Sequence, residues 1–339
     1  MKKLIVITFS FILLLSVPIF SQSVSKVGTT AAGFLNIDVG ARAVSMGGAF
    51  VSVADDISAM YWNSAGIARF SRSKAMFSHT NWIGGVTFNY AGVAVPMGHL
   101  GTVGINATFL TMPDMERTTI LEPDGTGEMF SAGSYAFGLC FARALTDRFS
   151  IGLNAKYVTE EIYHSRSQGL ALDVGTLFNT QFYGLTIGMN ISNFGTKLNL
   201  SGRDMLTQSD IDPQIYGNNP NINASLNTDD FDMPLMFRVG VSTDVLNGRG
   251  NSNLILAADA LHPSDDVESV NLGGEYVFNK TFSLRAGYRS VFADSEEGLS
   301  FGAGLKYQLM EQAEIVFDYA YLDFGILDNI QKFTLTLTF

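Results

Sequence analysis

Few residues in this chain have the type and spacing needed for catalytic or metal chemistry. The single cysteine, Cys140, excludes thiolate metal clusters and any intrachain disulfide. Residues 71–74 match the pattern Ser-x-x-Lys, but a four-residue match of this kind arises by chance. The histidines lack the close spacing of zinc ligands on one helix face: they are His79, His99, His164 and His262. We therefore predict no enzymatic activity, no metal and no cofactor, with a serine–histidine site assembled only by folding as the open alternative.

Composition narrows the class of protein further. The chain has 339 residues, of which 47% are apolar and only 16% charged, against about 25% charged in typical soluble domains. Its net charge of −11 argues against nucleic-acid binding. Beyond the first twenty residues, no apolar run reaches the roughly 20 residues of a membrane-spanning helix. A large globular β protein or a membrane β-barrel remains.

The first residues read as a secretory signal peptide. Lys2 and Lys3 precede an apolar run over 4–20, and Ser21 supplies a small residue at its end. We predict that residues 1–21 are removed and that the mature chain lies beyond the inner membrane. A single anchoring helix is the alternative.

Residues 74–339 alternate between apolar and polar side chains in segments of about ten residues, the length of a tilted membrane strand. In the last segment Phe333, Leu335 and Leu337 share one face, and threonines occupy the other. The segments predict about fourteen strands, an even number typical of outer-membrane barrels. They are 74–82, 85–96, 100–111, 132–143, 148–160, 168–178, 183–193, 233–245, 252–260, 268–278, 281–290, 299–308, 313–322 and 331–339.

The connections between these segments sort by parity. Those after even-numbered strands are short, whereas those after odd-numbered strands include the two longest, 112–131 and 194–232. Four connections of medium length also come after odd-numbered strands: 161–167, 261–267, 291–298 and 323–330. Outer-membrane barrels have short periplasmic turns and longer outer loops, and a soluble sandwich has no reason for this sorting. The fold class is therefore predicted as an all-β transmembrane antiparallel barrel.

If the apolar face meets lipid, the other face lines the lumen. Charged side chains fall on that second face, as expected because a charge at the lipid midplane costs a few kcal/mol. Their mixed signs predict paired networks, and both a packed lumen and a conducting pore stay open. The predicted lumen set is Lys156, Asp173, Arg238, Asp259, Glu275, Arg285, Arg289, Lys306 and Asp318.

Residues 22–73 neither alternate nor resemble a flexible linker. Asp55 or Asp56 can cap a short helix over 57–62. Gly47 and Gly48, with Gly66, permit tight turns and close backbone approach. We predict an ordered hatch that enters the lumen, with a periplasmic extension as the alternative.

Three motifs in this segment resemble the N-terminal region of PorV/PorQ-type proteins, in the FadL-like superfamily of outer-membrane barrels. They are Val39-Gly-Ala-Arg42-Ala-Val-Ser-Met-Gly-Gly-Ala-Phe50, Ala54-Asp-Asp56 and Tyr61-Trp-Asn-Ser-Ala-Gly66. The ending, from Tyr319-Ala-Tyr-Leu-Asp-Phe-Gly325 to Phe339, is similar to the family's last hairpin. Where the family usually has proline after the asparagine of its Asn-Pro-Ala-Gly turn, this chain has Ser64, which leaves φ unrestrained.

The resemblance implies a 14-stranded barrel with an N-terminal hatch whose turn is carried by Asn63, Ala65 and Gly66. It implies an interaction or shuttle component of type IX secretion, in the outer membrane. Its partners would be membrane lipid, a large translocation barrel and the C-terminal signal domains of secreted cargo, met through 112–131 and 194–232. FadL-like members instead take up hydrophobic small molecules, which is the alternative function.

Overall fold

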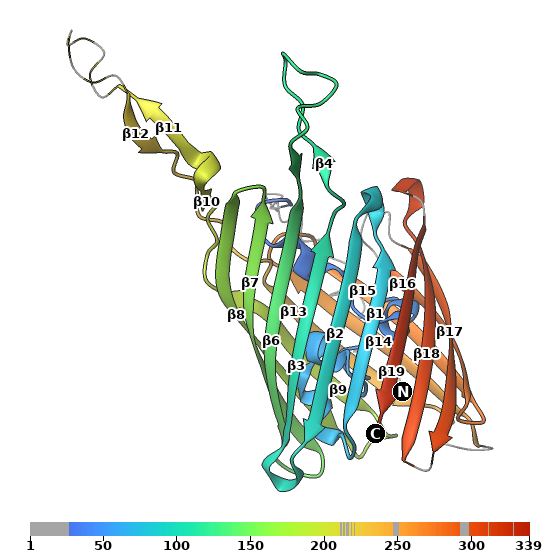
Figure 1. Ribbon diagram of the computed structural model, residues 1–339. Helices are drawn as coiled ribbons and strands as arrows, with labels where there is room; N and C mark the ends of the chain where they lie inside the picture. The colour runs from blue at the N-terminus through green and yellow to red at the C-terminus, as the bar shows by residue number, and fades with distance from the viewer. Residues whose placement is uncertain are drawn as a thin grey trace, which may run out of the picture.

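The computed structural model describes residues 27–210, 212, 214, 217, 219, 221–246, 251–291, 298–310, 312–327 and 329–339. The predicted signal peptide, 1–21, lies outside the described residues. Within the described part of the chain, fourteen antiparallel strands close into a barrel (Figure 1). The predicted all-β barrel is confirmed.

Each barrel strand pairs with the next one in the chain. The first and last strands close the ring, in a register that runs from Lys74 opposite Thr338 to Asn81 opposite Gln331. The barrel strands are β1 (Lys74–Asn81), β2 (Thr87–Pro96), β3 (Thr102–Thr111), β6 (Ala132–Ala144), β7 (Phe149–Ile162), β8 (Ser165–Asn179), β9 (Thr186–Gly195), β13 (Met236–Asp244), β14 (Asn253–Pro263), β15 (Ser269–Phe278), β16 (Phe282–Val291), β17 (Leu299–Met310), β18 (Ala313–Asp323) and β19 (Asn329–Thr338).

The alternation of the sequence becomes an apolar outer face and a mostly polar inner face. On β19, Phe333 and Leu335 point outward and are exposed on the isolated chain, whereas Thr334 and Thr336 are buried inside. An apolar outer face is what a barrel in a bilayer requires. None of the helices among the described residues is long and apolar enough to cross a membrane.

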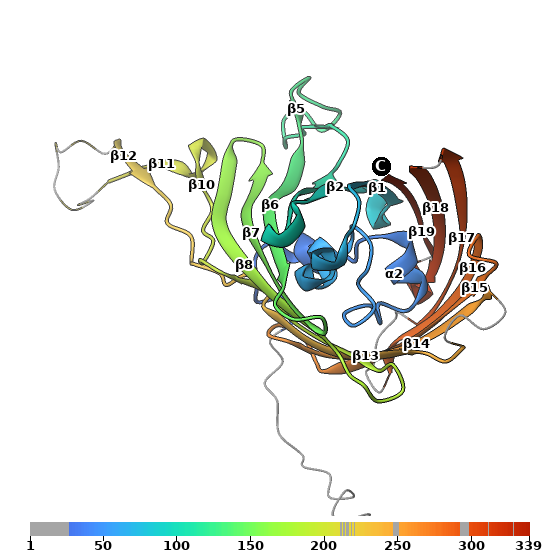
Figure 2. The same cartoon turned by 90° about the horizontal axis from the view of Figure 1, so that it is seen from below.

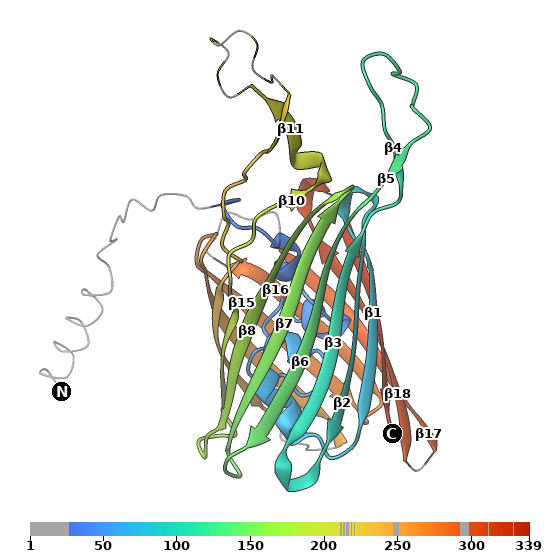
Figure 3. The ribbon, with the colours of Figure 1, turned by 60° about the vertical axis from the view of Figure 1, so that its left-hand side comes forward.

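The long connections rise from one end of the barrel (Figures 1 and 3). Two of them carry short strands of their own: β4 (Met115–Glu116) and β5 (Met129–Phe130) in one, and β10 (Ser201–Gly202), β11 (Leu206–Ser209) and β12 (Ile222–Ser225) in the other. We call this end the outer end and the opposite one the basal end.

One predicted connection is wrong. The outer connection placed at 161–167 is reduced to Tyr163 and His164, because β7 and β8 stay paired up to Ile162 opposite Ser165. Tyr163 takes a positive φ of 53°, which lets the chain reverse within two residues. This outer connection therefore does not follow the parity rule.

Residues 27–73, the luminal segment, lie inside the barrel (Figure 2). They form short helical turns in place of strands: η1 (Gly33–Asn36), α2 (Ala41–Ser45), α3 (Ala59–Trp62) and η2 (Ser64–Arg69). The helix expected over 57–62 is shorter than predicted. Asp56 accepts a hydrogen bond from Ser58 N at 2.8 Å just before it begins.

Candidate functional site

The luminal segment runs through the barrel from its outer end to its basal end. At the outer end Thr30 Oγ1 donates to Asp265 at 2.6 Å, and Ala31 N donates to the carbonyl of Asp232 at 3.0 Å. Asp265 and Asp232 both belong to outer connections. At the basal end the segment continues into β1 at Lys74. The segment therefore occupies the path that any molecule crossing the lumen would take.

Inward-facing glycines let the segment touch the wall backbone to backbone. A Cβ built on Gly287 of β16 would lie 2.1 Å from Gly47 N, and one on Gly152 of β7 would lie 2.3 Å from the carbonyl carbon of Ser64. Real Cβ atoms do not approach so closely, so these wall positions accept only glycine while the segment is seated. The small residues of the segment thus pack directly against the inward-facing glycines of the strands.

A charged network joins the segment to the wall near its basal end. Arg42 Nη2 lies 2.7 Å from Glu275 on β15, and Arg42 also pairs with Asp55 and, at 3.3 Å, with Asp56. Burial lowers the pKa of the Arg42 guanidinium, but the attraction of Asp55, Glu275 and Asp56 outweighs it and holds that pKa above its ordinary value. Arg42 is therefore a fixed positive charge.

The network continues into the wall. Arg285 lies 2.6 Å from Glu275 and 2.7 Å from Asp318. The structure thus brings together three predicted hatch residues and three predicted lumen residues, which are Arg42, Asp55, Asp56, Glu275, Arg285 and Asp318.

Other predicted lumen residues hold the segment in different ways. Asp259 on β14 accepts hydrogen bonds from the backbone N–H groups of Phe50 and Val51, at 2.7 and 2.8 Å. The Arg238 guanidinium lies over the rings of Tyr61 and Trp62, 5.6 and 5.2 Å from their centroids. Burial, and then the charge of Asp38, raise the pKa of Tyr61, so its hydroxyl stays protonated.

The remaining predicted lumen residues form separate pairs. Lys156 pairs with Asp173 at 2.8 Å on neighbouring strands of the wall. Arg289 lies 3.0 Å from Asp38 of the luminal segment, and Lys306 pairs with Glu314 at 2.7 Å at the basal end. The lumen set is therefore several clusters at different depths.

The predicted turn residues lie deep in the barrel. Asn63 Oδ1 accepts from Ala65 N at 3.2 Å, while Asn63 Nδ2 donates to the carbonyls of Val51 and Thr176, both at 2.9 Å. A Cβ on Gly66 would lie 2.0 Å from the carbonyl oxygen of Ala54. Gly47 and Gly48 take positive φ values of 65° and 74° where the chain turns after α2.

Sequence reasoning missed several wall residues that contact the segment. Lys332 of β19 donates to the carbonyl of Asp38, Thr334 Oγ1 accepts from Ala41 N at 2.9 Å, and Ser300 Oγ accepts from Gly47 N at 3.0 Å. The apolar–polar alternation of β19 was sufficient to place Lys332 on the inward face of the strand, which it shares with Thr334. The contacts themselves depend on how the segment folds.

The segment separates two recesses. The outer recess, of about 230 Å³, has an apolar side of Ile37, Val44, Trp82, Leu322, Phe324 and Ile330, and a polar side of Asp38, Arg289 and Lys332. The basal recess, of about 400 Å³, is lined mainly by polar and charged groups that include the Arg42 network. Among the described residues no cluster of three or more metal-ligating side chains occurs.

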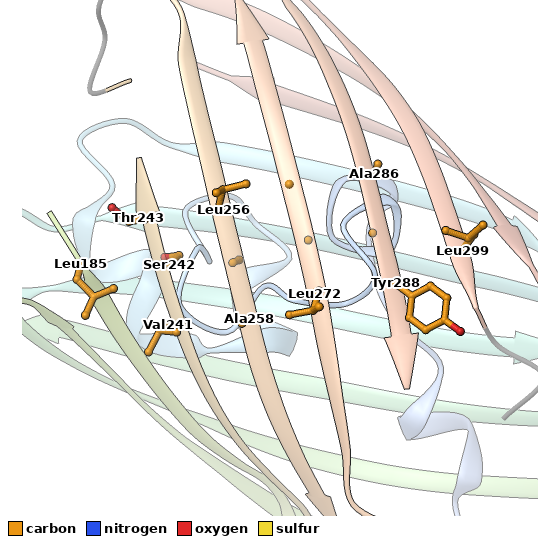
Figure 4. A pocket seen from close by; sticks show the side chains of 14 residues that line it. Leu185, Val241, Ser242, Thr243, Leu256, Ala258, Leu272, Ala286, Tyr288 and Leu299 are labelled. Carbon is orange, nitrogen blue, oxygen red and sulfur yellow. The ribbon is translucent and has the colours of Figure 1, made fainter. Parts of the chain in front are cut away.

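The outer face of the wall carries a shallow apolar groove of about 610 Å³ across β13 to β17 (Figure 4). Leu256, Leu272 and Tyr288 border it. Its floor includes Gly273 and Gly287, which contact Met46 and Gly47 of the luminal segment on the other side of the wall. At this place a single layer of backbone lies between the groove and the segment.

Comparisons with known proteins agree with the barrel. Residues 16–137 match the model of an uncharacterised protein family (UPF0164). No curated protein matches the chain in sequence. Solved structures match over most of their length: a FadL homologue of Pseudomonas aeruginosa at 12% identity (87% of this chain, 96% of that one, TM-score 0.50), and the toluene transporters TbuX of Ralstonia pickettii at 11% (89% and 98%, 0.50) and TodX of Pseudomonas putida at 11% (88% and 97%, 0.52). At these identities the likeness concerns the fold. By its fold, this chain is similar to the FadL-type outer-membrane barrels.

Proposed function

We propose that this protein is an outer-membrane channel for the uptake of hydrophobic small molecules and that the luminal segment is its hatch. The observation that carries the proposal is the partition of the lumen. A recess with one apolar and one polar side lies at the outer end of the segment, and a mainly polar and charged recess lies at its basal end. A molecule that enters the outer recess can go further only if the segment moves.

The similar structures support the same reading. Two of them are described as toluene transporters and one as a FadL homologue. The apolar groove across β13 to β17 offers lipid-side surface opposite Gly47, separated from the luminal segment by a single layer of backbone (Figure 4). No residue in these recesses is arranged for catalysis among those described, so transport is the activity proposed.

The type IX secretion role implied by the PorV/PorQ resemblance receives no support from these comparisons. Neither the matching family model nor the similar structures name a secretion component. The uptake function is therefore preferred over a partnership with a translocation barrel and cargo signal domains.

A reversible crosslink tests the hatch. In a Cys140→Ser background, Ala41→Cys with Thr334→Cys would join the segment to β19, where Ala41 N and Thr334 Oγ1 are 2.9 Å apart. We expect uptake of labelled toluene by cells that express the protein to stop on oxidation and to return on reduction.

The matched control keeps Thr334→Cys and pairs it with Ser78→Cys, its directly opposed neighbour on β1. This second crosslink joins wall to wall and should leave uptake intact. Equal uptake with and without the segment crosslink would contradict the hatch. A deletion strain that loses surface display of secreted proteins but keeps uptake would favour the secretion role.

A further inference from the structure

Lys332 projects from β19 into the lumen beside the outer recess, where only 2% of the residue is exposed. Its ammonium group donates to the carbonyl oxygen of Asp38 and lies 5.1 Å from the centroid of the Phe88 ring. The Asp38 carboxylate is engaged elsewhere, in an ion pair with Arg289 at 3.0 Å. Among the described residues, no carboxylate forms an ion pair with Lys332.

A buried ammonium in this state is incompletely satisfied. It has three donor hydrogens, and one backbone carbonyl and one ring face do not replace a counter-charge. Burying an unpaired charge is costly, and ionisable residues inside membrane proteins therefore commonly mark ligand sites. In the lining of the recess the one carboxylate, that of Asp38, pairs with Arg289, and Lys332 forms no ion pair there.

The rest of the recess is suited to an apolar body. Trp82 and Phe324 meet edge to face with ring centroids 5.5 Å apart, and Val44 and Leu322 complete the apolar side. The volume of about 230 Å³ lies below the roughly 300–1,000 Å³ of pockets that hold drug-sized ligands. A single ring or a short chain fits this space, and a long acyl chain does not.

We infer that the outer recess binds small organic acids, with the carboxylate at Lys332 and a one-ring or short-chain body against Trp82 and Phe324. This inference rests on the proposed uptake function and names the class of molecule admitted by it. The binding energy comes from both halves of the ligand. The carboxylate supplies the counter-charge that Lys332 lacks, and the apolar body removes the aromatic pair from water.

The experiment uses the purified full-length protein and two probes of the same shape, phenylacetate and its neutral amide, phenylacetamide. The chain has two tryptophans, and Trp82 lines the recess, so quenching of its fluorescence reports occupancy. Trp82→Phe assigns the signal, and calorimetry measures binding independently. We expect phenylacetate to bind about ten- to a hundredfold more tightly than phenylacetamide, the range of one charge-assisted hydrogen bond.

Lys332→Met should remove that preference, and Lys332→Arg should keep it. Lys306→Met is the matched control, since it removes a lysine at the basal end and should leave phenylacetate binding unchanged. If Lys332→Met does not fold, the comparison of the two probes on the unaltered protein still decides the question. Equal binding of acid and amide would overturn the acid preference and leave uptake of hydrophobic molecules standing. Binding of neither probe, together with no uptake by cells, would contradict both proposals.

Discussion

Glu275 of β15 is shared by two arginines, Arg42 of the luminal segment at 2.7 Å and Arg285 of the neighbouring strand at 2.6 Å. The Glu275 carboxylate therefore forms one ion pair within the wall and another with the segment. The Glu275 side chain is only 2% exposed and that of Arg42 17%, so the pair is well shielded from water. The ion pairs that join Arg42 to the wall thus depend on one wall side chain.

Glu275→Gln should loosen this attachment. It would leave Arg42 and Arg285 without their shared counter-charge, and breaking a buried pair from one side costs about 3–5 kcal/mol. We expect a lower thermal unfolding temperature and faster proteolysis within residues 40–60. Lys306→Gln, which breaks a half-exposed pair at the same end of the barrel, should cost no more than about 1 kcal/mol. Equal effects of the two substitutions would argue against a special role for Glu275.

Asp259→Asn should expose the backbone of the segment to solvent exchange at one place. The N–H groups of Phe50 and Val51 both donate to the same carboxylate oxygen of Asp259, and a neutral amide oxygen lacks the charge that strengthens these two hydrogen bonds. Hydrogen exchange read by mass spectrometry should rise in peptides that cover Phe50 and Val51. Peptides that cover the paired wall strands β6 and β7, which do not contact Asp259, serve as the internal reference and should not change.

Gly287→Ala should unseat the segment although it adds a single methyl group. The new Cβ would lie 2.1 Å from Gly47 N, and because the wall at Gly287 cannot retreat without breaking sheet hydrogen bonds, the segment has to move. Gly274→Ala on the adjacent strand is the control, because its Cβ would meet nothing closer than 3.5 Å. We expect increased uptake or ion leakage with Gly287→Ala only. A stable Gly287→Ala protein without increased uptake or ion leakage would show that the packing between segment and wall is looser than described.

Ser64→Pro, which restores the family's usual turn residue, should be tolerated and stabilising. Asn63 has extended φ and ψ of −165° and 98°, outside the helical region that proline disfavours in the preceding residue, and Ser64 begins η2, a position that favours proline. The Ser64 hydroxyl is buried and makes no hydrogen bond to the described residues, so little is lost with it. We expect a gain of about 0.4–1 kcal/mol in thermal or denaturant unfolding. Destabilisation would mean that the turn geometry departs from the family's.

The strands and their inward faces were predictable because they depend on local pattern. All fourteen barrel strands lie within a few residues of the predicted segments, since a period-two pattern in contact with lipid leaves little freedom of register. The error at 161–167 arose where β7 and β8 continue beyond the membrane-length pattern, so that hydropathy no longer marks their ends.

The luminal segment was predictable as an ordered unit but not as a set of contacts. Its glycines and small residues indicated close packing, yet the motif does not say which strand each one touches. Arg42 meets Glu275 across 233 residues of sequence, and Gly47 meets Gly287 across a similar separation. The alternation of β19 marks Lys332 as inward-facing, but only the seated segment buries its charge.

The sequence by itself determined that this chain is a barrel with an apolar exterior. Both the alternation of apolar and polar residues and the sorting of long and short connections can be read directly from the order of the residues. Only the tertiary structure decided how the lumen is divided, which charges meet across it and where a cation is left without a counter-charge. The reason is physical: strand periodicity is a local property, whereas burial and ion pairing depend on distances that exist only after the barrel closes around the luminal segment.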